Sequence, residues 1–472
     1  MDRSMLGMHR RGAGDTVYIA KYIERYRIRI NAPVACCHQD VRRYVVERAM
    51  KVSDVRITPI AFRDAPVLNA SGIHEPYALR TILEVECDNG MVGLGETYGD
   101  AAVLSAVRAV APALAGMSPY DLNSMEAQIR QILTALPAAQ AGTELAPGSH
   151  PSKQVPNCFS AFEVAFLDLQ AKAAGVPLHQ LLGGAVRREV PFSAYLFFKY
   201  ARHIDADYAD DPWGEALDPE GIVRQATRMI NLYGFESIKL KAGALHPDIE
   251  CATIRALAQA FPGLPLRIDP NAAWSMETAV RVAGELAGLL QYYEDPVAGL
   301  GPMAELHRAT GLPLATNMVV TDFDELRQSI AQNAVQIVLS DHHYWGGMRR
   351  TQTLAAICDH FGLGLSMHSN SHLGISLMAM AHVAAATPKL SYACDTHYPW
   401  VEDDDEVVMG GKVKIEGGCV RVGDEPGLGV SIDRARLERL NGIFERIAIR
   451  SRDDVAQMRK YDPAFDPGKP RF

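Results

Sequence analysis

The chain has 472 residues, of which 48% are hydrophobic and 22% charged, and its formal net charge is -9 at pH 7. This composition is typical of a soluble enzyme that is long enough to form more than one hydrophobic core. The net negative charge argues against a nucleic-acid partner or an anionic membrane surface, because both require a basic face. The longest apolar run that could form a helix, residues 374–386, is too short to span a bilayer.

The eight cysteines show no spacing typical of a metal site, and Cys36 and Cys37 are adjacent. They are predicted to be free thiols in a reducing, cytoplasmic environment. No apolar signal segment opens the chain, and residues 1–49 mix Arg, Tyr and Cys without periodicity. We interpret residues 1–49 as an N-terminal extension that is either disordered or upstream of a natural start at Met50.

A different pattern begins at Met50. Residues 52–62 and 77–97 read as strands, and the second segment contains the turn Asp88-Asn89-Gly90, which predicts a β-hairpin. Helical periodicity follows in three segments, residues 102–116, 122–133 and 161–175. We therefore predict an α+β domain over residues 50–188.

Near Pro191, short apolar segments begin to alternate with amphipathic ones. The predicted strands are residues 192–198, 237–241, 266–271, 292–296, 314–318, 335–341, 363–369 and 390–397. Strands that alternate with helices form right-handed parallel units, and about eight of them over about two hundred residues fit a closed barrel better than an open sheet. No glycine fingerprint for a dinucleotide follows the first strand, which disfavours a doubly wound fold. The barrel is predicted over residues 189–400.

The remaining segment, residues 401–472, begins with an acidic run from Glu402 to Glu406. Because like charges so dense repel one another, we interpret this run as a solvated loop without chemistry. A hairpin is expected around Gly417 and Gly418, followed by a helical tail.

Polar side chains stand at the end of every predicted barrel strand. In strand order they are Tyr195, Lys239 with Lys241, Asp269 with Asn271, Glu294, Asn317, Asp341, His368 and His397. Each residue alone has an ordinary explanation, such as a helix cap or a surface carboxylate, but the complete series is much harder to explain in that way. Active sites of β/α barrels form at these strand ends, so the sequence predicts one here.

Asp269, Glu294 and Asn317 follow three adjacent strands, so their oxygens are expected to converge on one side of the barrel mouth. Three hard oxygen ligands with room for water and substrate suit Mg²⁺. The absence of a thiolate or imidazole from this set disfavours zinc. An amide in place of a third carboxylate leaves the site less negative, which favours an anionic substrate oxygen in the coordination shell.

Lys239 and Lys241 are two residues apart in a predicted strand, so both ammonium groups point to one face. Two like charges so close favour the neutral form of one of them, which makes Lys241 a candidate base tuned by Lys239. His368 follows the seventh strand, across the mouth from Lys241, and Asp341 is expected to accept a hydrogen bond from its other nitrogen. Two opposed bases beside a metal predict proton abstraction α to a carboxylate.

The order of these motifs resembles the enolase superfamily, and most closely its glucarate dehydratases. The resemblance runs from about Met50 to Arg452, through KLKAG, RIDPNAAWS, YYEDP, LPLATNM, SDHHYWGG, MHSNSHLGISL, DTHYPW and PGLGV. It implies a modified (β/α)8 TIM barrel of the (β/α)7β type, with an N-terminal α+β capping domain that the C-terminal tail completes. It also implies a Mg²⁺-dependent hydro-lyase that converts a hexarate dianion, such as D-glucarate or L-idarate, to 5-keto-4-deoxy-D-glucarate and water.

Residue by residue, the resemblance implies that Lys241 and His368 are the two bases, that Asp341 pairs with His368, and that His368 acts as acid on the departing hydroxyl. The metal ligands it implies are Asp269, Glu294 and Asn317. The substrate contacts it implies are His74, Tyr195, Lys239, Asn271, Ser369, Asn370, His397 and Arg452, with Ser149 a weaker candidate. The segment after YYEDP is shorter than is typical of the family and lacks a further acidic residue, so Glu294 is the expected second ligand and Asp295 its substitute.

Three other functions remain open. An acid-sugar epimerase or racemase needs the same two bases without a leaving group, and a Schiff-base lyase would use Lys241. A low-activity glucarate dehydratase-related protein would bind acid sugars or assist an active partner. The expected partner is a small aldarate dianion, with neither nucleic acid nor membrane, and barrels of this type are expected to form homo-oligomers.

Overall fold

The computed structural model describes residues 50–136, 150–208 and 211–472. The extension predicted for residues 1–49 and the weaker candidate Ser149 lie outside this part of the chain. Residues 50–472 form one compact unit. No helix in the described part of the chain is both long enough and apolar enough to cross a bilayer.

The capping domain contains an antiparallel sheet in the order β1-β4-β5. Its strands are β1 (Val52–Arg63), β4 (Tyr77–Cys87) and β5 (Val92–Tyr98), and the loop between β1 and β4 holds the small hairpin β2 (Leu68–Asn69) and β3 (Gly72–Ile73). The helices are α3 (Ala101–Val110), α4 (Leu122–Thr134), α5 (Gln154–Ala174) and α6 (Leu178–Leu181). The predicted hairpin and the three predicted helices are therefore present.

Helix α5 lies directly against β5 because two glycines on that strand leave room for its backbone. A Cβ on Gly93 would lie 2.1 Å from the carbonyl oxygen of Ala165, and one on Gly95 would lie 2.3 Å from that of Ala161. Any larger residue would push the helix off the sheet. These glycines set the distance between the capping sheet and the helix that packs on it.

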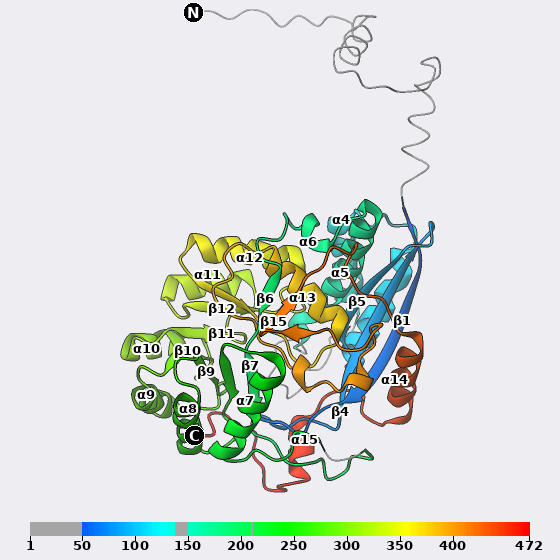
Figure 1. The fold of residues 1–472 in the computed structure, drawn as a ribbon. Helices are drawn as coiled ribbons and strands as arrows, with labels where there is room; N and C mark the ends of the chain where they lie inside the picture. Colours follow the sequence, from blue (N-terminus) through cyan, green and yellow to red (C-terminus); the bar gives the residue numbers. More distant parts are fainter. Residues whose placement is uncertain (1–49, 137–149, 209–210) are drawn as a thin grey trace, which may run out of the picture. The chain divides into compact units, whose positions relative to one another are not determined.

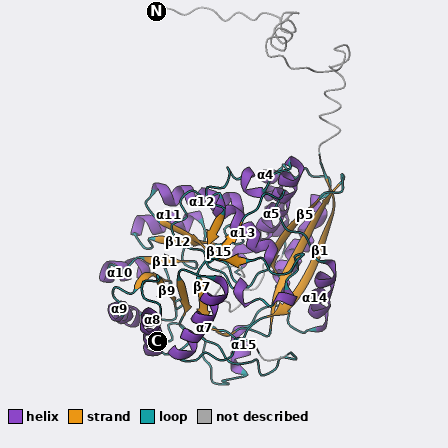
Figure 2. Ribbon diagram, in the orientation of Figure 1, coloured by secondary structure: helices purple, strands orange, loops and turns teal. Residues whose placement is uncertain are grey.

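The barrel contains one seven-stranded sheet in the order β13-β12-β11-β10-β9-β8-β7 (Figures 1 and 2), and its neighbouring strands are parallel. The strands are β7 (Ala194–Phe197), β8 (Ile238–Lys241), β9 (Leu266–Asp269), β10 (Leu290–Glu294), β11 (Leu314–Thr316), β12 (Ile337–Ser340) and β13 (Gly364–Met367). The helices are α7 (Pro219–Tyr233), α8 (Pro247–Ala260), α9 (Met276–Glu285), α10 (Leu300–Thr310), α11 (Phe323–Gln332), α12 (Met348–His360) and α13 (Gly374–Ala385). The predicted modified barrel with a capping domain is confirmed.

The eighth predicted strand, residues 390–397, is reduced to two single bridges that close the sheet. Cys394 forms a parallel bridge with Phe192, just before β7, and Asp395 forms one with His368, just after β13. The backbone N–H of Asp395 also donates to the carbonyl of Met367 at 2.9 Å. These contacts place Asp395 beside His368 at the barrel mouth.

The C-terminal segment returns to the capping domain. Strands β14 (Ile415–Glu416) and β15 (Cys419–Arg421) join β6 (Glu189–Pro191), and the helices are α14 (Arg434–Arg446) and α15 (Asp454–Arg459). Helix α14 lies along β1 (Figure 1), and its Asn441 side chain donates to the carbonyl of Pro59 at 2.7 Å. Short 3-10 helices are η1 (Ala111–Leu114), η3 (Pro151–Lys153), η4 (Tyr398–Trp400) and η5 (Asp403–Asp405).

The acidic run is only partly the solvated loop that its charge predicts. Asp403 and Asp404 are exposed, but Asp405 and Glu406 are fully buried. The Glu406 carboxylate accepts the backbone N–H of Gly374 at 3.0 Å, at the beginning of α13. The interpretation is wrong for Asp405 and Glu406, because local charge density does not show which acceptors the fold needs: Glu406 serves the beginning of α13, and Asp405 pairs with Arg63 and Arg439.

The prediction of free thiols can be compared with the structure for six of the eight cysteines, since Cys36 and Cys37 lie outside the described residues. Each of the six cysteines in the described part of the chain is free, and five of them are buried.

Candidate active site

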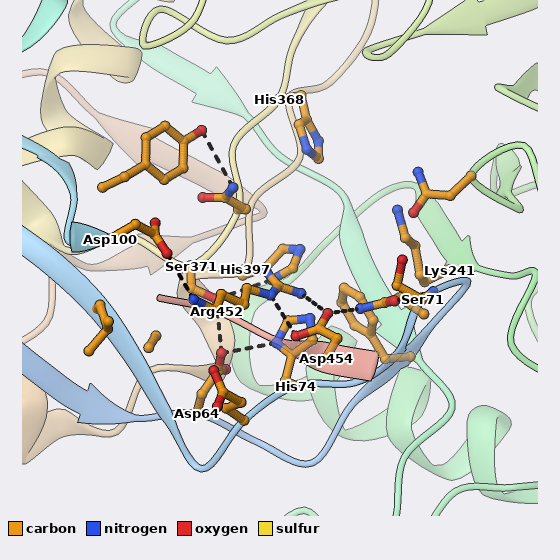
Figure 3. Close-up of a pocket in the computed structure, with 18 of the residues that line it drawn as sticks. Asp64, Ser71, His74, Asp100, Lys241, His368, Ser371, His397, Arg452 and Asp454 are labelled. Carbon is orange, nitrogen blue, oxygen red and sulfur yellow. Dashed lines mark hydrogen bonds and ion pairs between the residues drawn. The ribbon is translucent and has the colours of Figure 1, made fainter. Parts of the chain in front are cut away.

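A cavity of about 120 Å³ lies where the carboxyl ends of the barrel strands meet the capping domain. From the barrel side it is lined by residues that the sequence predicts, namely Tyr195, Lys241, Asn271, Asn317, Asp341, His368, Asn370 and His397. From the capping domain and the C-terminal segment it is lined by His74 and Arg452, both predicted, together with Asn69, Ser71 and Asp454. Figure 3 shows Lys241 and His368 set apart from a group formed by His74, Arg452 and Asp454. The structure therefore brings most of the predicted site residues to one cavity.

Four predicted residues do not line this cavity and are fully buried, namely Lys239, Asp269, Glu294 and Ser369. The Lys239 ammonium lies 2.7 Å from Glu294 Oε1, 3.3 Å from Asp395 Oδ1 and 3.6 Å from Asp269 Oδ2. Burial disfavours its charged form, but the surrounding carboxylates, led by Asp395 and Glu294, outweigh burial and raise the pKa of Lys239 well above its usual value. Lys239 is therefore a fixed positive charge that holds three carboxylates together beneath the cavity.

Lys241, by contrast, reaches the cavity from the end of β8. Its ammonium donates to Asp269 Oδ2 at 2.7 Å and lies 6.0 Å from the centre of the Tyr195 ring. The Tyr195 hydroxyl donates to the same oxygen at 3.2 Å. Burial alone would raise the pKa of Asp269, but Lys241 and Lys239 outweigh it and hold this pKa well below its usual range.

The three predicted metal ligands end three neighbouring strands. Asp269 is the last residue of β9, Glu294 is the last of β10, and Asn317 follows β11 directly. All three are buried, and Glu294 Oε2 and Asn317 Oδ1 have no hydrogen-bond partner among the described residues. Buried oxygens without a donor are costly unless a cation or other partner compensates them. Their chemistry, with carboxylate and amide oxygens only, fits Mg²⁺.

Glu294 rather than Asp295 offers a free oxygen for the second ligand position. Both oxygens of Asp295 accept hydrogen bonds, one from the Thr316 hydroxyl at 2.5 Å and one from the backbone N–H of Asn317 at 2.9 Å. Burial, reinforced by Asp269, raises the pKa of Glu294 well above its usual value. A divalent cation would relieve this repulsion, because it neutralises the charge that burial penalises.

His368 follows β13, and its partner is Asp395 rather than the predicted Asp341. Nδ1 of His368 contacts Asp395 Oδ1 at a short distance, and Lys239 contacts the same oxygen. Asp341 is engaged elsewhere, because its Oδ1 accepts from His343 Nδ1 at 2.6 Å and from the His343 backbone N–H at 2.8 Å. The predicted pairing is wrong because a histidine two residues further along the chain takes up the Asp341 carboxylate.

Asp395 sets both the orientation and the tautomer of His368. A carboxylate at Nδ1 keeps the proton on that nitrogen and leaves Nε2 as the acceptor. Burial would raise the pKa of Asp395, but Lys239 and His368 outweigh it and lower this pKa. Asp395 therefore stays an acceptor. The sequence carried a signal for it, since Asp395 precedes His397 by two residues and so lies on the same face of an extended segment.

Another part of the cavity wall is formed by two histidines and an arginine, and His397 reaches from there to within 5.2 Å of the Tyr195 ring centre. The His74 and His397 rings are stacked, with centres 5.6 Å apart. His74 Nδ1 lies 2.9 Å from Asp64 Oδ2, and the Arg452 guanidinium binds Asp454 through Nε at 2.7 Å and through Nη2 at 2.5 Å. Burial, reinforced by nearby positive groups, lowers the pKa of His397 well below its usual value. His74 and Arg452, the predicted substrate contacts, thus line the cavity, while their partners Asp64 and Asp454 were not predicted.

Asn271 and Asn370 hold their side chains by contacts near the cavity. Asn271 Nδ2 lies 3.0 Å from Met318 Sδ, and its backbone N–H donates to Asp269 Oδ1 at 3.1 Å. Asn370 Nδ2 donates to the Tyr98 hydroxyl at 3.5 Å. This contact links the loop after β13 to the capping domain.

Comparison with known proteins agrees with this architecture. Residues 221–436 match the enolase C-terminal domain-like family, and residues 54–183 match the N-terminal domain of the mandelate racemase / muconate lactonizing enzyme family. Over 434 residues the chain is 48% identical to a "Probable glucarate dehydratase" from Streptomyces coelicolor, covering 90% of this chain and 100% of that relative.

Two solved structures are similar over nearly the same region. An enolase from Pseudomonas fluorescens with bound magnesium, potassium and tartrate is 63% identical, with a TM-score of 0.89 over 90% of this chain and 100% of that chain. An enolase from Mycobacterium smegmatis complexed with tartrate is 50% identical, with a TM-score of 0.85 over 90% of this chain and 99% of that chain. The chain therefore belongs to the enolase superfamily, as its resemblance to glucarate dehydratases predicts.

Proposed function

We propose that the protein is a Mg²⁺-dependent dehydratase of hydroxylated dicarboxylates, with a hexarate such as D-glucarate or L-idarate as substrate. The observation that carries this proposal is the single cavity that Lys241 and His368 enter from strands on different sides of the barrel. Both groups lie near the Tyr195 ring, Lys241 Nζ at 6.0 Å and the His368 ring at 6.2 Å from its centre. The similarity to a probable glucarate dehydratase supports the same reaction class.

The reaction begins with removal of the proton α to a carboxylate. Lys241 or His368 takes this proton, depending on the configuration of the carbon, because the two groups approach the cavity from different strands. When bound by Asp269, Glu294 and Asn317, Mg²⁺ supplies Lewis-acid stabilisation of the negative charge that develops on the carboxylate. Lys239 stabilises the carboxylates that surround this position.

The second step is loss of the β-hydroxyl. When His368 has taken the α-proton, it passes that proton to the departing hydroxyl; when Lys241 is the base, His368 enters the reaction already protonated on Nε2. In both cases the C–O bond breaks with release of water and a carbon–carbon double bond forms. The resulting enol tautomerises to the 4-deoxy-5-keto acid. Asp395 supports this step, since it stabilises the protonated imidazole that donates.

The two ends of the cavity suit a substrate with a carboxylate at each end. Lys241 lies apart from His74 and Arg452 in the cavity (Figure 3), and Asn317, one of the proposed metal ligands, also lines it. A guanidinium binds carboxylates in a defined geometry, which favours a dianion. Tartrate, which both solved relatives contain, is itself a hydroxylated dicarboxylate.

The experiment that tests this proposal is a screen of acid sugars for keto-acid formation with Mg²⁺. We expect turnover of at least one hexarate, and loss of dehydration in Lys241→Ala and in His368→Asn. Lys389→Ala, which removes an exposed lysine paired with Asp359, is the matched control and should retain activity. Near-normal turnover in either active-site variant would count against the two-base site.

An epimerase is the second candidate, because it uses the same two opposed bases and differs only in the absence of a leaving group. Proton NMR in D₂O separates the two. Exchange of the α-proton without loss of water indicates an epimerase, whereas keto-acid formation indicates a dehydratase.

A further inference from the structure

The last residues of the chain, 462–472, follow α15 and return to the barrel. Their sequence, DPAFDPGKPRF, contains three prolines and forms neither helix nor strand. Proline restricts the backbone already in the unfolded chain, so docking a segment of this kind costs less conformational entropy. Figure 1 shows the end of the chain beside α8, and the Phe472 ring centre lies 5.7 Å from that of His246, the N-cap of α8. The segment therefore reaches the loops at the carboxyl ends of the barrel strands.

The loop after β9 is hydrogen-bonded to the backbone of this segment. The N–H of Arg471 donates to the carbonyl of Ala273 at 2.7 Å, and the N–H of Ser275 donates to the backbone oxygen of Phe472 at 2.5 Å. The contacts run in both directions between the two segments, as they do between paired strands. They fix residues 471–472 along the loop.

A lysine of the same segment holds the strained part of this loop. Asn271 and Ala272 have φ of 49° and 58°, in the left-handed region that is unfavourable for residues other than glycine. The Lys469 ammonium donates to the carbonyl of Asn271 at 3.0 Å. Asn271 lines the cavity, and the proposed metal ligand Asp269 precedes it by two residues. Strain at a cavity wall persists only where the surroundings hold it, and Lys469 is one of the groups that do so.

Arg471 connects the capping domain to the barrel. Its Nη2 donates to the carbonyl of Ala70 at 2.8 Å, and its Nη1 donates to the carbonyl of Gly243 at 3.3 Å. Ala70 lies in the turn between β2 and β3 and precedes Ser71, which lines the cavity. Gly243 follows Lys241 by two residues. One guanidinium thus joins the hairpin that faces the cavity to the loop that begins at Lys241.

Gly243 is the point where the loops after β8 and β9 touch. Its N–H donates to Oε2 of the fully buried Glu250 at 3.0 Å, so the peptide groups on both sides of Gly243 are hydrogen-bonded. A Cβ at Gly243 would lie 2.2 Å from the carbonyl oxygen of Pro270. With so little space between the loops, a displacement of one is transmitted to the other.

The Arg471 side chain is placed at a cost. Its Nε is buried and has no hydrogen-bond partner among the described residues, and the guanidinium lies 4.5 Å from the centre of the Phe465 ring. A buried donor without a partner is unfavourable, so the contacts of the two Nη atoms and the ring must offset it. A guanidinium with its donors pointing in different directions can bridge two carbonyls, whereas an ammonium on a flexible stem lacks this fixed geometry.

We propose that Lys469 and Arg471 are positioning residues, and that residues 469–472 form a C-terminal clasp that holds two walls of the cavity in place. Lys469 fixes Asn271 on the barrel side, and Arg471 fixes the hairpin β2–β3 against the loop after Lys241. Neither Lys469 nor Arg471 lines the cavity, so both act through the residues that they hold. The inference rests on the proposed function, because it assigns to the clasp the binding of an acid sugar between these walls.

Amide hydrogen exchange, followed by mass spectrometry on the full-length Mg²⁺-loaded protein, tests the clasp without a substrate. Backbone amides of both walls are hydrogen-bonded, that of His74 to the carbonyl of Val67 at 3.0 Å and that of Ala272 to the carbonyl of Asp295 at 2.7 Å. Their exchange therefore reports local opening. We expect residues 68–74 to exchange about tenfold faster in Arg471→Met, and residues 271–275 about tenfold faster in Lys469→Met, since each variant removes hydrogen bonds from a charged donor. Peptides from β10 to β12 should keep their wild-type exchange.

Steady-state kinetics with a hexarate tests the effect of the clasp on substrate binding. KM should rise about tenfold in Arg471→Met while kcat stays within about threefold of wild type, because looser walls bind the substrate less well and the bases are unchanged. The conservative Arg471→Lys keeps a donor and should give a smaller rise. A contact that served stability alone would lower the free energy of unfolding and leave KM unchanged.

The matched control is Arg187→Met, because the Arg187 guanidinium also donates to backbone carbonyls, those of Ala384, Thr387 and Pro388, and does not line the cavity. Its KM and its exchange in residues 68–74 and 271–275 should equal those of wild type. Thermal unfolding verifies that each variant is folded, and Arg471→Lys carries the test if Arg471→Met does not fold. Unchanged exchange in these two segments, faster exchange throughout the protein, or faster local exchange with unchanged KM each overturns the inference.

The two measurements distinguish failure of the clasp from failure of the proposed function. If exchange accelerates only in the predicted segments but wild type dehydrates no acid sugar, the clasp on the cavity walls stands and the proposed reaction fails. If wild type dehydrates a hexarate while the Lys469 and Arg471 variants keep wild-type exchange and KM, the reaction stands and the clasp is wrong.

Discussion

Replacing Asp395 with asparagine separates the proposed partner of His368 from the other groups of the site. The substitution keeps the shape of the side chain but removes the charge that contacts His368 Nδ1 and that lies 3.3 Å from Lys239 Nζ. A hydrogen bond to a charged group contributes about 1.5 to 3 kcal/mol, and each 1.4 kcal/mol changes a rate about tenfold. We therefore expect kcat to fall about 10- to 160-fold, because the protonated form of His368 loses its counter-charge when it donates to the departing hydroxyl.

The assay is the initial rate of keto-acid formation at saturating Mg²⁺ and hexarate. Asp168→Asn is the matched control, because Asp168 is also fully buried and bound to a lysine, Lys172 at 2.6 Å, away from the cavity. Its kcat per folded molecule should stay near that of wild type. If the kcat of Asp395→Asn remains within about threefold of wild type, the assignment of Asp395 as the partner of His368 is refuted.

Three further predictions concern the metal, the packing and the pH dependence. Chelation of the metal should stop turnover. In calorimetry, Glu294→Gln should weaken Mg²⁺ binding about 10- to 100-fold more than Asp295→Asn does. Equal losses of Mg²⁺ affinity in the two variants would mean that Glu294 is not the distinct second ligand. Gly347→Ala should lower the free energy of unfolding by about 2 kcal/mol or more in denaturant titrations, since Gly347 has φ 102° and a Cβ would lie 2.0 Å from Glu163 Oε2; wild-type stability would contradict this. Burial raises the pKa of Glu163 from 4.5 to about 7, so its contribution to stability is complete below about pH 4.5 and is lost as the pH rises through 7. The free energy of unfolding of the wild type should therefore fall between about pH 5 and pH 8, and in Glu163→Gln this fall should be smaller by up to about 3 kcal/mol. The same fall in both proteins would exclude Glu163 as its source.

The position of the active site could be predicted from the sequence because the topology determines it. Parallel strands joined by helices place the ends of all strands at one side, so Lys241, Asp269, Glu294, Asn317 and His368 had to converge there. This argument needs only the residue at each strand end. It requires no knowledge of which side chains pair.

The pairing of side chains could not be predicted, because two carboxylates flank His368. Asp341 follows the strand on one side of β13, and Asp395 lies in the bridging segment on the other side. The choice between them depends on His343, whose contact with Asp341 is a detail of one turn. In the same way, the role of Lys239 depends on three carboxylates from distant segments, which the strand pattern of KLK does not reveal.

The proposed two-base geometry is tested most directly by α-proton exchange in D₂O, followed by NMR, with two hexarates that are epimers at the reacting carbon. If Lys241 and His368 face opposite sides of this carbon, each single variant keeps only one base. His368→Asn, which keeps Lys241, should then exchange the α-proton of one epimer only, and Lys241→Ala, which keeps His368, should exchange the α-proton of the other epimer only. Loss of exchange from both epimers in one variant and from neither in the other would contradict the account, because a single base would then serve both faces.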